Sequence, residues 1–276
     1  RRVRAGPCQP AVARMTRART SPLGRGDLRA RVAAGEKTVG TFVGTASAVT
    51  AEACAAAGVD WLVLDLEHGA GGEDLVGAVV LAAAAYGVPT VVRVESAARI
   101  RLGRVLDLGA AGVMLPRLDT SAEVREALRH VRYPPNGDRG VATSNRAHRF
   151  GLDSSALDSA NREVLGVVQI ESVQAVEQVE EIAALDGADV LFVGPRDLSH
   201  SLGVPGDFGA PTYLAALDRV RAAAHLHGKA GGLMVPDGAA AAARLGEGWT
   251  FVAVASDSTL LAAAVTAELA RARAAN

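Results

Sequence analysis

The amino-acid sequence predicts an α/β protein, a (β/α)₈ barrel of the TIM type in which eight parallel strands close on themselves inside a ring of helices. From about residue 38 onward, eight short apolar segments alternate strictly with eight segments rich in Ala, Leu and Glu. Eight such pairs in roughly 240 residues match the size of one closed barrel. The chain of 276 residues is therefore expected to hold one large domain.

The predicted strands are almost continuous apolar runs, which is typical of parallel strands covered on both faces. They are Thr38–Gly44, Asp60–Glu67, Thr90–Val94, Gly112–Pro116, Val164–Glu171, Val190–Gly194, Lys229–Val235 and Phe251–Asp257. The predicted helices are Ala48–Ala57, Glu73–Tyr86, Arg99–Leu108, Ser121–Val131, Ser172–Leu185, Pro211–His227, Gly238–Leu245 and Thr259–Arg273. We expect long loops at 132–160 and 200–211, where this alternation is interrupted.

A doubly wound open sheet is the alternative architecture. Such a sheet usually carries a glycine-rich phosphate loop after its first strand. Residues 44–47, Gly-Thr-Ala-Ser, do not form one, and residues 68–72, His-Gly-Ala-Gly-Gly, lack the third glycine of the fingerprint. We therefore favour the closed barrel.

Composition narrows the class of protein. Hydrophobic residues make up 49% of the chain and charged residues 21%, the balance of a soluble globular protein. The longest apolar runs, such as Val79–Ala85, are far shorter than the ~20 residues of a spanning helix, so no membrane partner is expected. Two cysteines, Cys8 and Cys54, cannot build a disulfide framework. We expect a cytoplasmic protein.

Charge is distributed unevenly along the chain. Residues 1–37 hold ten basic and two acidic residues, whereas the remainder holds 19 basic and 28 acidic residues. A nucleic-acid-binding arm is the alternative interpretation, but no aromatic residue lies in this stretch to stack on bases. We predict a basic leader at 1–37, disordered or partly helical, followed by one catalytic barrel domain at 38–276, with no nucleic-acid partner.

Polar residues gather where the predicted strands end, which is where barrel enzymes place their chemistry. His68 follows the second strand, and its neutral imidazole suits a general base near pH 7. Arg93 is flanked by valines in the third strand. A charged group there needs a partner, and we favour an anion-binding role over a salt bridge inside the barrel.

Two carboxylates, Glu171 after the fifth strand and Asp197 after the sixth, offer the oxygen ligands that Mg²⁺ or Mn²⁺ prefers. The alternative is that each caps the helix that follows it. For the pair, we favour metal binding. The two lysines, Lys37 and Lys229, lie at the opposite end of the barrel. A Schiff-base mechanism needs a lysine near the active rim, so carbanion stabilisation would fall to a metal.

The sequence resembles the class II 2-oxo-acid aldolases of the HpcH/HpaI family from about Gly40 to its end. The motifs that carry the resemblance are Gly58-Val59-Asp60-Trp61, Asp65-Leu66-Glu67-His68, Val91-Val92-Arg93, Leu106-Asp107-Leu108-Gly109, Arg132-Tyr133-Pro134-Pro135, Gln169-Ile170-Glu171, Gly194-Pro195-Arg196-Asp197-Leu198-Ser199 and Gly228-Lys229. The resemblance implies a metal-dependent lyase that reversibly cleaves a 4-hydroxy-2-oxo acid to pyruvate and an aldehyde.

The resemblance also implies roles for single residues. His68 is the general base, made more basic by Asp107, and Arg93 stabilises the pyruvate enolate. Glu171 and Asp197 hold the divalent cation, which is Mg²⁺, Mn²⁺ or Co²⁺. Gln169 and the backbone at Arg196 and Asp197 contact the 2-oxo acid. The Arg196 side chain departs from the family pattern, because many relatives have a small residue there, and it either binds an anionic group of the substrate or crowds the site.

Two other functions remain open. A relative with these residues can act as a condensing enzyme or a CoA-ester lyase, in which case activity depends on CoA. A non-catalytic small-molecule binder is the other alternative, and the full set of His68, Arg93, Glu171 and Asp197 argues against it.

Asp107 bears on assembly. It lies near the C-terminal end of the predicted helix after the third strand, so it faces the opposite end of its own barrel from His68. The pairing that the resemblance implies would then join two subunits. We expect a homo-oligomer, and the resemblance implies a hexamer built as a trimer of dimers.

Overall fold

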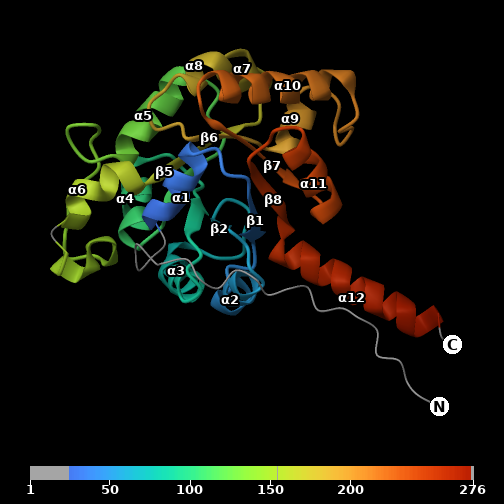
Figure 1. The fold of residues 1–276 in the computed structure, drawn as a ribbon, viewed down its shortest axis with the longest axis horizontal. Helices are drawn as coiled ribbons and strands as arrows, with labels where there is room; N and C mark the ends of the chain where they lie inside the picture. Colours follow the sequence, from blue (N-terminus) through green and yellow to red (C-terminus); the bar gives the residue numbers. More distant parts are fainter. Residues whose placement is uncertain (1–24, 154, 275–276) are drawn as a thin grey trace.

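A computed structural model describes residues 25–153 and 155–274 and confirms the predicted fold class. Eight parallel strands form a closed barrel in the order β1 to β8, with β8 pairing with β1 (Figure 1). The strands are β1 Thr38–Val43, β2 Trp61–Asp65, β3 Thr90–Arg93, β4 Gly112–Leu115, β5 Leu165–Ile170, β6 Val190–Val193, β7 Ala230–Val235 and β8 Phe251–Ser256. Each lies within a predicted strand, because the apolar run is also the buried run.

The predicted helices are present as well, two of them divided. They are α2 Ala48–Ala56, η1 Glu73–Leu75 with α3 Val76–Ala84, α4 Arg99–Asp107, α5 Ser121–Val131, α7 Val173–Glu177 with α8 Val179–Ala183, α10 Pro211–Leu226, α11 Gly238–Gly246 and α12 Asp257–Ala274. The division between α7 and α8 falls at Gln178, which leaves helical geometry and accepts a hydrogen bond from the Ser121 N–H at 2.9 Å.

The expectation of a plain loop at 132–160 is wrong in part. This segment contains η2 Arg146–Gly151 and the start of α6 Ser155–Glu163. Helix α6 buries none of its side chains, and only three of its nine residues, Ala156, Leu157 and Ala160, are apolar. A further short helix, α9 Pro195–Ser201, follows β6 directly and begins with proline at a position that favours helix initiation.

Helix α1, Arg25–Ala33, closes the amino-terminal end of the barrel. Leu28 and Val32, one helical turn apart, are buried with the aromatic side chains of the barrel interior. The folded core therefore begins earlier than the predicted boundary at residue 38. The part of the basic leader that precedes residue 25 lies outside the described residues.

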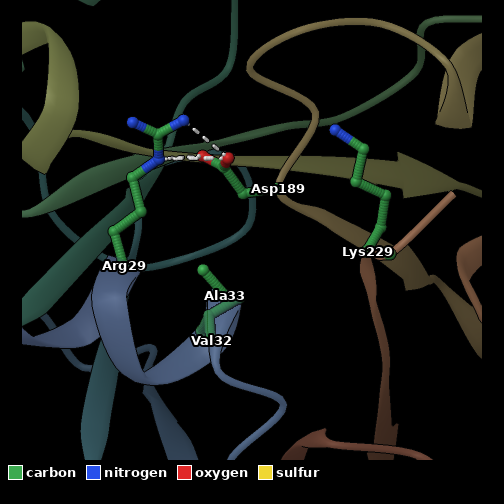
Figure 2. Close-up of a pocket in the computed structure, with 6 residues that line it drawn as sticks. Arg29, Val32, Ala33, Asp189 and Lys229 are labelled. Atoms are coloured by element: carbon green, nitrogen blue, oxygen red, sulfur yellow. Dashed lines mark hydrogen bonds and ion pairs between the residues drawn. The ribbon is translucent and has the colours of Figure 1, made fainter.

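A bidentate ion pair fastens α1 to the barrel. Arg29 donates from Nε and Nη2 to Asp189 at 3.0–3.1 Å, and Asp189 directly precedes β6 (Figure 2). Lys229, which directly precedes β7, lines the same pocket. Both lysines of the chain, Lys37 before β1 and Lys229, therefore lie at the amino-terminal end of the strands, as predicted.

Aromatic rings fill the lower half of the barrel. Trp61 stacks on Phe251 with ring centroids 3.9 Å apart, and Phe192 meets Phe251 edge-on. Gly40 lies under the Trp61 ring, where any Cβ would overlap the indole. Because this end is packed and covered by α1, the barrel opens toward its carboxyl-terminal rim, with Phe42 below Arg93.

Helix α12 extends away from the barrel, toward the carboxyl terminus (Figure 1). Every residue from 258 to 274 is exposed, including Leu260, Leu261, Val265 and Leu269. None of the helices in the described part of the chain is long and apolar enough to cross a membrane.

Candidate active site

Arg93 is the centre of a buried charge cluster at the carboxyl-terminal rim. The β2–β3 register places Arg93 opposite Asp65. The guanidinium donates from Nε to Asp65 Oδ1 at 2.8 Å and from Nη2 to Oδ2 at 2.7 Å, and Nη1 lies 3.2 Å from Glu67 Oε2. Arg93 therefore has the salt bridge that a buried charge requires, and it points into the barrel mouth above Phe42.

The pKa values of the two acids in this cluster, Asp65 and Glu67, are shifted in opposite directions. Burial alone would raise the pKa of Asp65, but the hydrogen bonds and charge of Arg93 outweigh it and hold that pKa below its usual value. Burial raises the pKa of Glu67, and the charge of Arg93 only partly offsets this. Asp65 is thus the fixed anion that orients Arg93, and Glu67 is the acid that holds a proton more readily.

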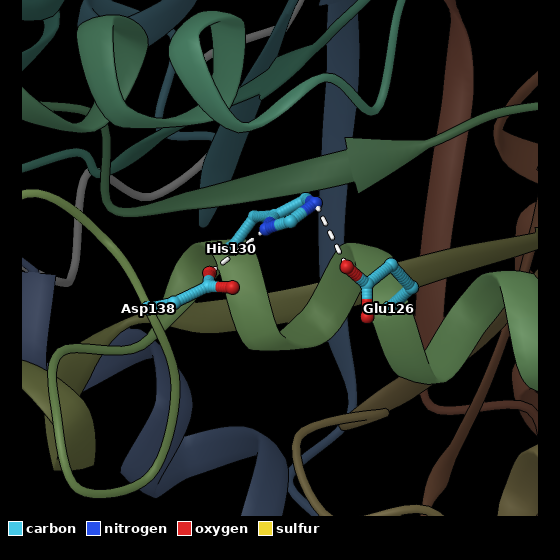
Figure 3. A group of neighbouring side chains, drawn as sticks. All are labelled: Glu126, His130 and Asp138. Carbon is cyan, nitrogen blue, oxygen red and sulfur yellow. Dashed lines mark hydrogen bonds and ion pairs between the residues drawn. The ribbon is translucent and has the colours of Figure 1, made fainter.

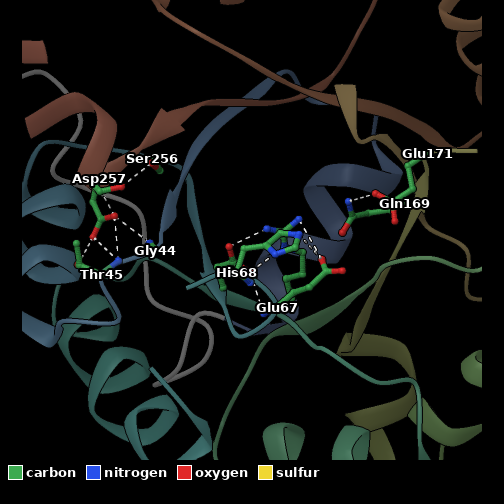
Figure 4. Close-up of polar contacts among 11 residues, drawn as sticks. Gly44, Thr45, Glu67, His68, Gln169, Glu171, Ser256 and Asp257 are labelled. Atoms are coloured by element: carbon green, nitrogen blue, oxygen red, sulfur yellow. Dashed lines mark hydrogen bonds and ion pairs between the residues drawn. The ribbon is translucent and has the colours of Figure 1, made fainter. Parts of the chain in front are cut away.

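His68 lies at the edge of this cluster (Figure 4). Its backbone N–H donates to Asp65 Oδ1 at 3.2 Å, and its Nε2 lies 3.8 Å from Glu67 Oε2. The imidazole side chain is 66% exposed, so it is open to substrate and solvent. The structure therefore brings the predicted base and the predicted enolate-binding arginine to one side of the rim.

Glu171 and Gln169 form a second polar group, at the end of β5 (Figure 4). Gln169 Nε2 donates to Glu171 Oε2 at 2.8 Å, and both side chains are buried. Gly194 lies close enough that an added Cβ would be 2.5 Å from the same Glu171 oxygen. Burial raises the pKa of Glu171 to about 7, with the backbone N–H of Arg117 opposing the shift and the negative charge of Asp197 adding to it.

Asp197 lies in the first turn of α9, with its side chain 48% exposed. The alternative that these acids cap helices does not hold. Gly194 occupies the cap position of α9, and the Ser172 side chain caps α7. Both carboxylates are therefore free of a capping role.

Arg117 is a site residue that the sequence did not reveal. It follows β4 with a positive φ of 54°, and its backbone N–H donates to Glu171 Oε1 at 2.6 Å. Its Nη1 lies 4.0 Å from Asp197 Oδ1. A left-handed backbone at an arginine leaves no signature in a single sequence, so only the structure connects β4 to the candidate metal ligands.

Asp257 is a second residue that reasoning from sequence left without a role. Its buried carboxylate accepts from the Gly44 N–H at 2.9 Å and from the hydroxyls of Thr50 at 2.9 Å and Thr45 (Figure 4). This group fastens the start of α12 to the loop after β1. The contacts satisfy the carboxylate within the fold, so its role here is structural.

Asp107 stands apart from the rim. It ends α4, and its Oδ1 accepts from Arg139 Nη2 at 2.6 Å. In the described chain Asp107 forms no ion pair with His68. The Asp107 side chain is 30% exposed, whereas that of Arg139 is only 4% exposed. A single chain therefore does not make the predicted pair.

A different acid–histidine group lies outside the rim (Figure 3). His130, in the last turn of α5, contacts Asp138 Oδ1 through Nδ1 at 2.8 Å and Glu126 Oε1 through Nε2 at 3.6 Å. The hydrogen bond with His130 is the main cause that lowers the pKa of Asp138. Each ring nitrogen of His130 faces a carboxylate of the same chain. We therefore interpret this group as a structural link between α5 and the segment after it.

The fold and the rim together define a class. A (β/α)₈ barrel that gathers an arginine, four carboxylates and a histidine at the carboxyl-terminal ends of its strands is organised as a barrel enzyme. Residues 38–264 match the family described as HpcH/HpaI aldolase/citrate lyase, and the chain belongs to that family. It is an aldolase, a carbon–carbon lyase.

Similar proteins agree with this assignment. A hydroxypyruvate/pyruvate aldolase of Sagittula stellata is 37% identical over 239 residues, covering 87% of this chain and 94% of the relative. A 5-keto-4-deoxy-D-glucarate aldolase of Salmonella paratyphi C is 37% identical, covering 83% and 90%. The crystal structure of an HpcH/HpaI aldolase/citrate lyase family protein from Burkholderia cenocepacia has a TM-score of 0.86 at 38% identity, covering 90% and 99%.

Proposed function

We propose that this aldolase reversibly cleaves a 4-hydroxy-2-oxo acid to pyruvate and an aldehyde, with a divalent cation held by Glu171 and Asp197. The observation that carries the proposal is the placement of Arg93. A guanidinium has five N–H groups. Asp65 takes two of them, and Glu67 lies near Nη1 as an ion-pair partner, so three remain for an oxygen that becomes negative during the reaction. The names of the two relatives, a pyruvate aldolase and a keto-deoxy-sugar-acid aldolase, support the same chemistry.

The residues at the end of β5 fit a cation. Gln169 Oε1 is buried and has no hydrogen-bond partner among the described residues, which suits a site that a bound group completes. Glu171 and Asp197 supply oxygen ligands of the kind that Mg²⁺, Mn²⁺ and Co²⁺ accept. When bound, such a cation supplies Lewis-acid chemistry by drawing electron density from the 2-oxo group.

The residues of the chain then divide the reaction between them. In the cleavage direction the bond between C3 and C4 of the substrate breaks, C4 becomes the aldehyde carbon, and its hydroxyl proton must leave. His68, exposed at the rim, accepts that proton. Arg93, held by Asp65, donates hydrogen bonds to the enolate oxygen as charge develops there. A proton returned to C3 completes pyruvate.

One assay tests the proposal directly. Pyruvate release from a panel of 4-hydroxy-2-oxo acids is measured on EDTA-treated protein, and again after adding Mn²⁺, Mg²⁺ or Co²⁺. We expect activity only with added metal. Full activity in EDTA, or a borohydride-trapped pyruvate adduct on Lys229, would refute the metal-dependent mechanism. Turnover that requires CoA and releases no pyruvate would instead identify a CoA-ester lyase or a condensing enzyme.

We also propose that the working enzyme is a homo-oligomer, with a hexamer as the expected assembly. Helix α12 exposes Leu261, Val265 and Leu269 on one face, at intervals of four residues, and no described residue of the same chain covers them. A second copy of the chain is the partner that supplies a matching surface. The position of Asp107, partly exposed and away from its own His68, supports the same conclusion.

A further inference from the structure

The positive charges at the rim fall into two groups. Arg93 is matched by two acids, Asp65 and Glu67, and its side chain is largely buried. Arg117 and Arg196 are exposed. Arg93 with its two acids, together with the metal-ligand pair Glu171 and Asp197, already accounts for the pyruvate half of the reaction. The two exposed arginines are therefore in excess of what that half requires.

The backbone of Arg117 is held in place, whereas its guanidinium is exposed. The backbone hydrogen bond to Glu171 and the left-handed φ fix where its side chain starts, directly beside the candidate metal ligands. The side chain itself is 73% exposed, and its contact with Asp197 is long, at 4.0 Å. Exposed ion pairs of this length contribute little stability, so the guanidinium is available to another anion.

Arg196 directly precedes Asp197 in the first turn of α9. Its guanidinium carbon lies 5.8 Å from the centre of the Phe208 ring. It forms no ion pair with any residue in the described part of the chain. Asp197 therefore has Arg117 near it in space and Arg196 next to it in sequence.

We propose that Arg117, supported by Arg196, binds a carboxylate on the aldehyde half of the substrate and so determines specificity. This inference rests on the proposed function, because that function puts pyruvate at Arg93 and the metal ligands and leaves the aldehyde half toward the open rim. A guanidinium binds a carboxylate through two parallel N–H donors. An uncharged aldehyde offers no such partner. Loss of Arg117 should therefore lower kcat/KM for aldehydes that carry a carboxylate and leave it nearly unchanged for uncharged ones.

A positioning role for Arg117 is the competing explanation. If its side chain served only to hold Asp197, its loss would weaken the metal site and slow every substrate alike. A matched pair of aldehydes separates the two roles. 4-Oxobutanoate and butanal both have four carbons, and only the first carries a carboxylate. Condensation of each with pyruvate is measured at saturating Mn²⁺ for wild type, Arg117→Gln, Arg117→Lys and Arg125→Gln.

Glutamine retains the backbone N–H that holds Glu171, and Arg125, exposed on α5, serves as the matched charge control. For Arg117→Gln we expect kcat/KM with 4-oxobutanoate to fall about 10- to 100-fold, mainly through KM, as for loss of a charged hydrogen-bond partner. We expect kcat/KM with butanal to stay within about 2-fold, as a neutral ligand loses no such partner. Arg117→Lys should recover part of the loss.

Solvent-deuterium exchange at C3 of pyruvate, followed by proton NMR, separates the inference from the proposed function on which it rests. Suppose that the wild-type enzyme catalyses the exchange, and that Arg117→Gln lowers kcat/KM for condensation equally with both aldehydes or with neither. The specificity role of Arg117 is then wrong, and the aldolase mechanism stands. If wild type with Mn²⁺ shows neither exchange nor condensation, the proposed function fails, and the specificity role fails with it.

Discussion

Asp65 and Arg93 face each other at the ends of neighbouring strands and are joined by two hydrogen bonds, of 2.8 and 2.7 Å. The pairing is possible because β2 and β3 are in parallel register with both side chains directed into the barrel mouth. It fixes the plane of the guanidinium before any substrate arrives. Charge stabilisation of this kind is effective because the donor does not have to reorganise during the reaction.

The first prediction compares the two members of this pair. Arg93→Ala removes the group that we propose as the donor to the enolate oxygen, so kcat should fall by roughly 10²-fold or more. Asp65→Asn keeps the guanidinium but replaces the charged acceptor, and we expect a smaller fall in kcat, about 10-fold, since a neutral hydrogen bond is weaker. Initial rates of pyruvate release give kcat and KM, and thermal melts report folding. A folded Arg93→Ala variant within a few-fold of the wild-type kcat would contradict the assigned role.

The second prediction concerns the stability of the metal-free protein. The pKa of Glu171 is about 7 in the folded chain, against an ordinary value of 4.5. Between these pH values the unfolded chain loses the proton that the folded chain retains, so stability falls as pH rises from about 4.5 to about 7. The loss is complete above pH 7 and amounts to at most about 3 kcal/mol.

Glu171→Gln cannot ionise and should escape this loss. In EDTA its Tm should exceed that of wild type at pH 8 by several degrees and match it near pH 4.5. Thermal melts across this range measure the difference, with Glu52→Gln, an exposed acid on α2, as the control. Parallel Tm profiles for wild type and Glu171→Gln would show that Glu171 does not carry the raised pKa.

The fold was largely predictable because strands buried inside a barrel appear in the sequence as continuous apolar runs. All eight strands are apolar runs, and the residues that follow them, such as His68 and Glu171, reach the rim by topology alone. Helix α1 was not predicted as part of the core. Leu28 and Val32 are its buried apolar residues among those described, and the arginines around them dominate the composition of that stretch.

The sequence was enough to predict which types of residue lie at the site. It was much less informative about which of them contact one another. Arg93 needed a partner, but its identity as Asp65 depends on strand register, which apolar runs do not specify. Arg117 acts on Glu171 through its backbone N–H, which every residue except proline has, so the side chain gives no indication of it. The single chain also leaves Asp107 paired with Arg139.

The last prediction concerns Asp107 and His68, which do not pair with each other within one chain. A carboxylate beside an imidazole fixes its tautomer and raises its basicity. We expect Asp107 of one subunit to serve His68 of another, which makes activity a property of the oligomer. Because Asp107→Ala leaves the buried guanidinium of Arg139 without its acid, Asp107→Asn, which keeps an oxygen for Arg139, is tested beside it. Each variant and His68→Ala should be nearly inactive alone.

Mixing the variants decides whether the pair crosses the interface. Asp107→Asn and His68→Ala proteins, differently tagged, are co-refolded in equal amounts, and mixed oligomers are recovered through both tags. If each site takes His68 from one subunit and Asp107 from its neighbour, random assembly rebuilds about one quarter of the sites, and activity should return in that proportion. Removal of residues 258–274, the exposed part of α12, should weaken assembly and prevent the recovery. Mixed oligomers that remain inactive would show that the two side chains do not meet between subunits.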